Sequence, residues 1–233
     1  FSITGEPSGA SGQSLSTTSA TTDGSGEAST TLTLGDTVGS YDVTGSVSGA
    51  GSVVFTASAT AGAASDMTIE TQPGASTAGG AVAGPASVRV TDTGGNPISG
   101  VDVTASLNGG SLTGGSTATE ATGLDGIASF GNLVIETAGS YTLTFNAAAS
   151  GVSDVESATF DVSAASASSI VASSGDGQSG EISTTLSSPF VVQVTDEFGN
   201  AVFGETVTFS ITGEPSGASG QSLSTTSATT DGS

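Results

Sequence analysis

VVQVTDEFGNAVFGETVTF, at residues 191–209, and SVRVTDTGGNPISGVDVTA, at residues 87–105, contain one shared pattern. Each includes V-x-V-T-D-x-x-G-N, in which alternating apolar residues lead into a turn that contains Gly and Asn. This alternation, followed by turn residues, is typical of a half-buried β-strand entering a hairpin. The Asp of the pattern recurs as Asp92 and Asp196, 104 positions apart. The sequence therefore predicts two homologous β modules, A and B, of about 100 residues each.

A longer repeat encloses the first. Residues 209–233 repeat residues 1–25 (FSITGEPSGASGQSLSTTSATTDGS) without a difference, so the offset from Phe1 to Phe209 is 208 positions. We expect the chain to be one A–B period plus an overlap from a longer array. Residues 1–62 are then the later part of module A, residues 65–165 a complete module B, and residues 168–233 the first part of the next module A. The joins at residues 62–65 and 163–166 are short and predict restricted motion between modules.

Apolar residues recur at every second position between turn signals. In module B these stripes are Val88 and Val90; Val101, Val103, Ala105 and Leu107; Tyr141, Leu143 and Phe145; and Phe160 and Val162. In the two parts of module A they are Phe190, Val192 and Val194; Val207, Phe209 and Ile211; Leu32 and Leu34; Tyr41, Val43 and Val47; and Val53 and Phe55. About seven such strands per module predict an all-β chain of tandem immunoglobulin-like β-sandwiches arranged as an elongated rod.

The charge balance excludes several classes of partner. Twenty-two Asp and Glu residues face one cation, Arg89, for a net charge of −21, and the chain has no His or Cys. Without a basic surface, binding to nucleic acid or to anionic membranes is excluded. No apolar run is long enough to span a bilayer, and disulfides are impossible. The acidic composition favours a salty, cation-rich exterior, where screening reduces self-repulsion.

The residue types also argue against catalysis. Without His, Cys or Lys, the usual general bases and nucleophiles are missing. The G-x-G string at residues 175–177 is followed by strand-like sequence rather than by the helix that a phosphate site needs. We expect no catalytic residues and no cofactor-binding residues, so the chain is not an enzyme.

Four motifs carry a family resemblance: S-G-D-G-Q at residues 174–178, V-x-V-T-D-x-x-G-N, T-T-D-G-x-G-E-A-S at residues 21–29, and G-S-Y-x-V-T at residues 39–44. With these motifs the chain resembles the bacterial immunoglobulin-like domains of intimin, invasin and giant surface adhesins. The resemblance covers nearly the whole chain, more loosely in module B, where Asp125-Gly126 replaces the longer turn. It implies an extracellular or cell-surface location, with modules that act mostly as rods.

Acidic residues offer candidate calcium ligands. The turns supply oxygens from Asp92 and Asn96 and from Asp196, Glu197 and Asn200, but two or three oxygens are fewer than the six to eight that Ca²⁺ takes. We interpret these turns, and the D-G turns at Asp23 and Asp125, as structural. Carboxylates near the joins are better candidates for Ca²⁺ sites that stiffen a rod: Asp66 and Glu70 at one join, and Asp154, Glu156 and Asp161 at the other.

Tyr41 and Tyr141 each open the penultimate predicted strand of a module. This position is that of a tyrosine corner, in which the ring fills the core and the hydroxyl bonds backbone. Stacking of the ring on a ligand is the alternative, and the parity shared with Val43 or Leu143 disfavours it.

These features predict a structural or adhesive repeat segment of a large extracellular surface protein or fibre, serving as a spacer or load-bearing stalk. Its partners would be the neighbouring immunoglobulin-like modules of the same chain. A multivalent binding module for polysaccharide or a partner-cell surface is one alternative, although exposed aromatic residues for sugar stacking are scarce. Lateral self-association into a filament is another, with no interface evident in the sequence.

Overall fold

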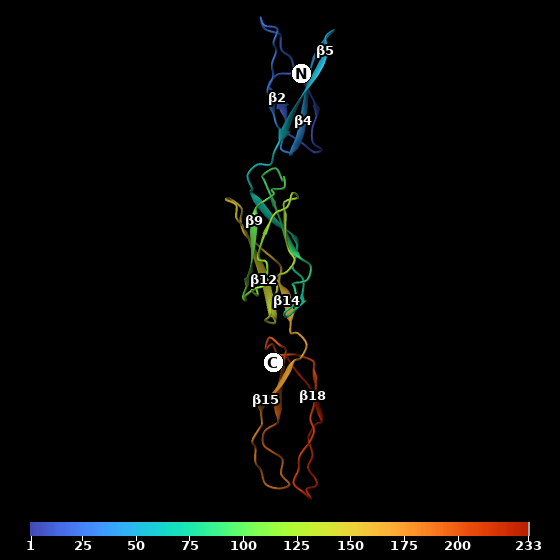
Figure 1. The fold of residues 1–233 in the computed structure, drawn as a ribbon, viewed down its shortest axis with the longest axis vertical. Helices are drawn as coiled ribbons and strands as arrows, with labels where there is room; N and C mark the ends of the chain where they lie inside the picture. Colours follow the sequence, from blue (N-terminus) through green and yellow to red (C-terminus); the bar gives the residue numbers. More distant parts are fainter. Residues whose placement is uncertain (233) are drawn as a thin grey trace.

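The computed structural model describes residues 1–232, and these residues form strands and turns with no helix. Figure 1 shows three parts that follow one another along the longest axis. The N-terminal part contains β1 (Ser2–Gly5), β2 (Ser14–Leu15), β3 (Leu32–Thr33), β4 (Gly39–Val47) and β5 (Gly51–Ala59). The central part contains β6 (Asp66–Thr71), β7 (Ser76–Thr77), β8 (Ala86–Thr91), β9 (Asp102–Asn108), β10 (Thr119–Ala121), β11 (Ile127–Phe130), β12 (Gly139–Ala147), β13 (Val155–Glu156) and β14 (Phe160–Ser163). The C-terminal part contains β15 (Ser169–Ser174), β16 (Val191–Thr195), β17 (Thr206–Thr208) and β18 (Ser227–Thr229).

The central part, which corresponds to module B, is a sandwich of two sheets. One sheet has the order β10-β9-β12-β14-β7, with β13 paired to β12, and the other has the order β11-β8-β6. Every ladder in it is antiparallel except that between β14 and β7. Seven of its nine strands are longer than two residues, which confirms the predicted immunoglobulin-like architecture.

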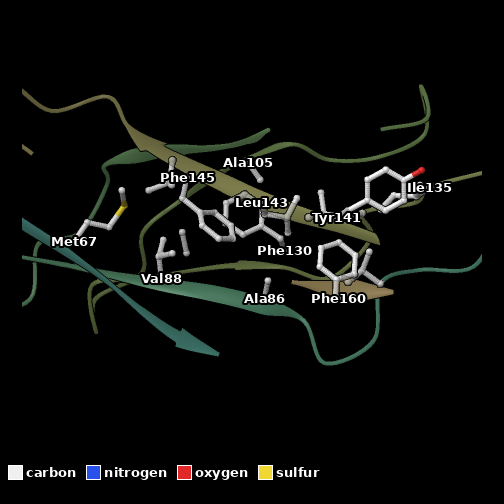
Figure 2. Packing of buried hydrophobic residues seen from close by; sticks show 14 of the residues in the cluster. Met67, Ala86, Val88, Ala105, Phe130, Ile135, Tyr141, Leu143, Phe145 and Phe160 are labelled. Carbon is white, nitrogen blue, oxygen red and sulfur yellow. The ribbon is translucent and has the colours of Figure 1, made fainter. Parts of the chain in front are cut away.

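The core of module B lies between these sheets and contains the stripes predicted from alternation. Figure 2 shows Leu143 and Phe145 on β12 facing Val88 on β8. The rings of Phe130 and Phe145 lie 5.3 Å apart at a tilted angle, a favourable aromatic arrangement. The buried cluster contains Met67, Ala78, Val82, Ala86, Val88, Val90, Val103, Ala105, Ala128, Phe130, Leu133, Ile135, Tyr141, Leu143, Phe145, Ala147, Phe160 and Val162. Val101 and Leu107, at the two ends of one predicted stripe, are only partly buried.

Both tyrosine corners are confirmed. The Tyr41 hydroxyl donates to the carbonyl of Thr37 at 2.8 Å, and the Tyr141 hydroxyl donates to the carbonyl of Thr137 at 3.0 Å. Both rings are buried. Because each hydroxyl bonds the backbone four residues upstream, the loop before β4 and the loop before β12 are held against the core in the same way.

The D-G sequence at Asp125 forms the predicted turn between β10 and β11. Gly126 has a φ of +75°, and a Cβ built there would lie 2.7 Å from the carbonyl oxygen of Val90. Asp125 Oδ1 accepts a hydrogen bond from the amide of Ile127. The corresponding turn at Asp23 is closed by hydrogen bonds from Ser25 and Glu27 to its carboxylate.

Gly126→Ala is expected to destabilise module B by about 2 kcal/mol, because the left-handed backbone disfavours any Cβ and the added methyl group also meets the backbone of β8. Chemical denaturation followed by circular dichroism measures this change. Gly131→Ala is the control, since nothing lies within 4 Å of a Cβ at Gly131. Equal denaturation midpoints for the two variants would contradict the assigned turn.

The two outer parts have fewer strands than module B, and residues of identical sequence differ in structure between them. Residues 2–5 form β1 because β4 lies beside them, whereas residues 210–213 have the same sequence and form no strand. Conversely, β18 pairs with β17, while the matching residues 19–21 form no strand. The stripe predicted over Val207, Phe209 and Ile211 therefore ends early, since β17 stops at Thr208.

Burial in the outer parts also differs from the predicted stripes. Tyr41, Val43 and Val194 are buried as expected. Several other residues of those stripes are exposed, because the outer parts have fewer strands than module B to cover them: Leu34, Val47, Val53, Phe55, Phe190 and Ile211.

Candidate functional site at the module joins

The D-x-x-G-N sequence after β8 folds into a compact turn centred on Asp92. Its Oδ1 accepts hydrogen bonds from the amides of Gly94 (2.9 Å) and Asn96 (2.8 Å). The amide of Gly95 donates to the Asp92 carbonyl, and Gly95 has a φ of +80°. The Asn96 side chain donates to both carboxylate oxygens of Asp92 at 3.0 Å. The turn interpretation is confirmed, and the turn fixes the orientation of two buried polar side chains.

The same two side chains also contact the preceding module, and we call this set of contacts the first join. Asn96 Nδ2 donates to the carbonyl of Asp36 at 2.8 Å, and the amide of Val38 donates to Asn96 Oδ1 at 3.0 Å. The amide of Gly62 donates to Asp92 Oδ2 at 2.8 Å. One turn thus binds the loop before β4 and the linker after β5, so it fixes two separate segments of its neighbour.

The second join repeats these contacts between module B and the C-terminal part. Asn200 Nδ2 donates to the carbonyl of Glu136 at 2.7 Å, and the amide of Ala138 donates to Asn200 Oδ1 at 2.9 Å. The amide of Ala165 donates to Asp196 Oδ2 at 2.9 Å. The arrangement is therefore a property of the repeat rather than of one position in the chain.

The loop that receives each Asn side chain is the loop fixed by the tyrosine corner. In the first join it contains Asp36, Thr37 and Val38, and the Tyr41 hydroxyl bonds the carbonyl of Thr37, which lies between the two residues that contact Asn96. The loop is thus held by Tyr41 of its own module and by Asn96 of the next module, so the first join links the cores of the two modules.

Side chains around the two turns differ in how they fill the space between modules. A Cβ on Gly94 would lie 2.6 Å from the carbonyl oxygen of Asp36, so the first join brings two backbones together. At the equivalent position the second join has Phe198, and a Cβ on Gly79 of module B would collide with its ring. Both joins have the polar contacts, and the second join also has Phe198 packed beside Gly79.

Ionised Asp is favoured in both turns. Burial opposes ionisation of Asp92, but hydrogen bonds from Gly62, Asn96 and Gly94 outweigh this cost and lower its pKa below the ordinary value of 3.8. Burial likewise opposes ionisation of Asp196, and hydrogen bonds from Asn200, Ala165 and Phe198 lower its pKa. Two of the donors, Gly62 and Ala165, lie across the joins. Ionisation of Asp92 and Asp196 therefore strengthens the hydrogen bonds between modules.

Acidification is expected to loosen both joins. A carboxyl whose pKa is lower in the folded state stabilises that state above its unfolded pKa, and this contribution is lost as pH falls through the folded pKa. The contribution of Asp92 and Asp196 is thus complete at neutral pH and decreases below pH 3.8. Small-angle scattering of the chain should show a broader range of shapes there. The double variant Asp92→Asn, Asp196→Asn should lack this step, and an identical step in it would contradict the assignment.

Within residues 1–232, no three Asp, Glu, His or Cys side chains are grouped in a way that could hold a metal ion. Glu70 pairs with Arg89 at 2.6 Å, and Glu156 accepts hydrogen bonds from Asn108 and Thr142. Asp161 bonds Ser140, and Asp66 lies on β6.

The prediction that Asp154 lies near the second join is wrong. Asp154 accepts a hydrogen bond from Asn146, near the end of β12 that pairs with the start of β9. The chain reverses after β12, and this reversal places Asp154 at the end of module B that faces the first join.

Sequence reasoning identified the turn residues but missed that they bridge modules. Asp and Asn in such a turn are explained by local bonds alone, so the second use of the same oxygens left no separate signal. The loops that bond to the Asn side chains do carry a signal in the sequence. Asp36-Thr37 and Glu136-Thr137 both precede the G-S-Y motif, at equal distance from Tyr41 and Tyr141.

Comparison with known proteins gives similarities of structure. No protein-family model matches the chain, and no curated protein matches it. The adhesin FdeC of Escherichia coli is 21% identical with a TM-score of 0.45, over 82% of this chain and 63% of that one. InvD of Yersinia pseudotuberculosis is 16% identical with a TM-score of 0.49, over 87% of this chain and 64% of that one. The chain therefore spans less than two thirds of the length of either protein, and at these identities the likeness concerns the fold.

Proposed function

We propose that the chain is a non-catalytic, rod-like spacer segment of an adhesive protein on the cell surface or outside the cell. The observation that carries the proposal is the repeated join, in which one Asp–Asn turn binds two segments of the preceding module. Three hydrogen bonds across each join restrain both bending and twisting, which a single flexible linker would leave free. Stiffness along the chain is what a spacer needs in order to hold a binding tip away from a surface.

Composition and sequence motifs support a location on the cell surface or outside the cell. A net charge of −21 keeps neighbouring rods apart and soluble. The motif resemblance to bacterial immunoglobulin-like adhesin modules favours an extracellular location, and one of the two structurally similar proteins is itself described as an adhesin. Near-identical repetition favours a role in which length matters more than the chemistry of any one unit.

The proposal is tested by displaying the chain between a surface anchor and a fluorescent tip. The tip should stand farther from the surface than with a Gly/Ser linker of equal length, whose mean extension grows only with the square root of residue number. Equal tip heights would overturn the spacer function. A glycan array probed with the same chain tests the alternative, since strong binding would assign the chain a recognition function instead.

A further inference from the structure

The turns of the two joins differ at the second residue after the Asp. This residue is Gly94 in the turn of module B and Phe198 in the turn of the C-terminal part, 104 positions later. In the first join, a Cβ on Gly94 would lie 2.6 Å from the carbonyl oxygen of Asp36, the atom that accepts the hydrogen bond from Asn96. The end of the N-terminal part therefore approaches the turn too closely for a side chain at this position.

The second join accommodates a ring at this position because module B has a glycine opposite it. The Phe198 ring lies over Gly79, and a Cβ on Gly79 would lie 2.4 Å from the ring atom Cζ. Phe198 lies in a turn, yet it is only 36% exposed. The contact thus removes apolar surface from water at the edge of the second join.

Gly79 is held in place by the segments that form the second join. Its amide donates to the carbonyl of Ile135 at 2.9 Å, and Ile135 directly precedes Glu136, whose carbonyl accepts the hydrogen bond from Asn200. The amide of Ala78 donates to the carbonyl of Ser163 at 2.8 Å, where the linker to the C-terminal part begins. The Phe198 ring therefore meets a backbone surface that is fixed by hydrogen bonds.

The C-terminal part shows that the turn around Gly79 also forms with a larger residue. Residues 77–80 form a turn closed by a hydrogen bond from the last amide to the first carbonyl, and Gly79 has a φ of +77°. Residues 181–184, 104 positions later, are closed in the same way, and Ser183 has a φ of +62°. A Cβ is therefore tolerated by this turn, and the ring of Phe198 gives a separate reason for glycine in module B.

The hydrogen bonds across the joins do not discriminate between modules. Asn96 and Asn200 each donate to a backbone carbonyl and accept from a backbone amide of the preceding part. Backbone groups of this kind are the same in every module, whatever side chains surround them. The choice of neighbour therefore depends on the residue that fills the space beside the turn.

We propose that this position determines which neighbour each turn accepts: Phe198 selects the end of module B through Gly79, and Gly94 selects the end of the N-terminal part. This selection rests on the proposed rod-like spacer and adds the partner that each turn recognises. It combines contact with exclusion. A ring in the turn is received by module B, but the Asp36 carbonyl excludes it from the N-terminal part, and Ser183 takes up the equivalent space in the C-terminal part.

The test is the distribution of distances between spin labels across each join of the full chain. Ser52→Cys with Ser129→Cys reports on the first join, and Ser129→Cys with Ser173→Cys reports on the second, since these serines are exposed. Both distributions should be narrow before any further change is made.

Gly79→Ala is expected to broaden the distribution across the second join and to leave the first unchanged, because the added methyl group meets the Phe198 ring. Gly109→Ala is the matched control within module B: Gly109 has a φ of +84°, and nothing lies within 4 Å of a Cβ there. It introduces similar backbone strain without the contact. The double variant Gly79→Ala, Phe198→Gly should be no broader than Phe198→Gly alone, since the methyl group then has no ring to meet.

Gly94→Phe is expected to shift and broaden the distribution across the first join, because the new side chain meets the carbonyl of Asp36. Thr93→Phe is the matched control, since it places the same ring on an exposed neighbour in the same turn. It should leave both distributions unchanged.

An unchanged second join in Gly79→Ala, or an unchanged first join in Gly94→Phe, would overturn the selection of neighbours and leave the spacer function standing. Control variants that broaden a join as much as the test variants would also overturn it, because the effect would then not depend on the space beside the turn. Broad distributions across both joins before any further change would contradict the spacer function itself, and the selection with it.

Discussion

Tyr141→Ala is expected to destabilise module B by about 3–5 kcal/mol, the cost of removing a large ring from a packed core. The ring is buried, lies 6.4 Å from that of Phe160, and its hydroxyl donates to the carbonyl of Thr137. Tyr141→Phe keeps the ring and loses only the hydrogen bond, so it should cost about 1 kcal/mol.

Denaturation followed by circular dichroism measures both variants, because the chain has no Trp for fluorescence. The difference between them separates packing from hydrogen bonding. A Tyr141→Ala variant that unfolds at the wild-type denaturant midpoint would show that the ring does not belong to the core.

Asp92→Ala is expected to cost about 3 kcal/mol and to free the first join. The carboxylate accepts hydrogen bonds from the amides of Gly94, Asn96 and Gly62, and its removal leaves these donors without their acceptor. Hydrogen bonds to a charged group contribute more than neutral ones, and unsatisfied buried donors add a desolvation cost.

Asp102→Ala is the control for the loss of one negative charge, since Asp102 is exposed on β9. It should leave the denaturation midpoint nearly unchanged. If the two variants unfolded alike, the turn at Asp92 would contribute no more than a surface charge, and the account of the join would fail.

Much of the fold of module B could be predicted from alternation and turn residues. The stripes at Val103 and Ala105 and at Leu143 and Phe145 are buried as expected, because a strand with one apolar face has one stable orientation in a sandwich. The tyrosine corners also followed from position, since Tyr41 and Tyr141 open long strands and share parity with core residues.

The outer parts could not be predicted in this way, and the repeated segment explains why. Residues 2–5 form a strand beside β4, and the identical residues 210–213 do not. Strand formation there depends on a partner supplied by distant sequence rather than on local propensity. The same dependence leaves Phe55 and Ile170 exposed despite a pattern typical of core residues.

The joins were beyond the reach of pattern analysis for a different reason. Asp92 and Asn96 satisfy each other within the turn, so nothing in the local sequence requires a further partner. Their bonds to Gly62, Asp36 and Val38 depend on how two modules meet, which periodicity does not encode.

We expect the Asp–Asn turns to hold successive modules in a fixed relative orientation. The distribution of distances between spin labels in two adjacent modules measures this orientation. Because the chain has no Cys, labels can be attached uniquely at Ser52→Cys on β5 and Ser129→Cys on β11, both exposed. We predict a narrow distance distribution at neutral pH that broadens when Asn96→Ala is added, since this change removes both hydrogen bonds to the loop before β4. A wild-type distribution as broad as that of the Asn96→Ala chain would contradict it.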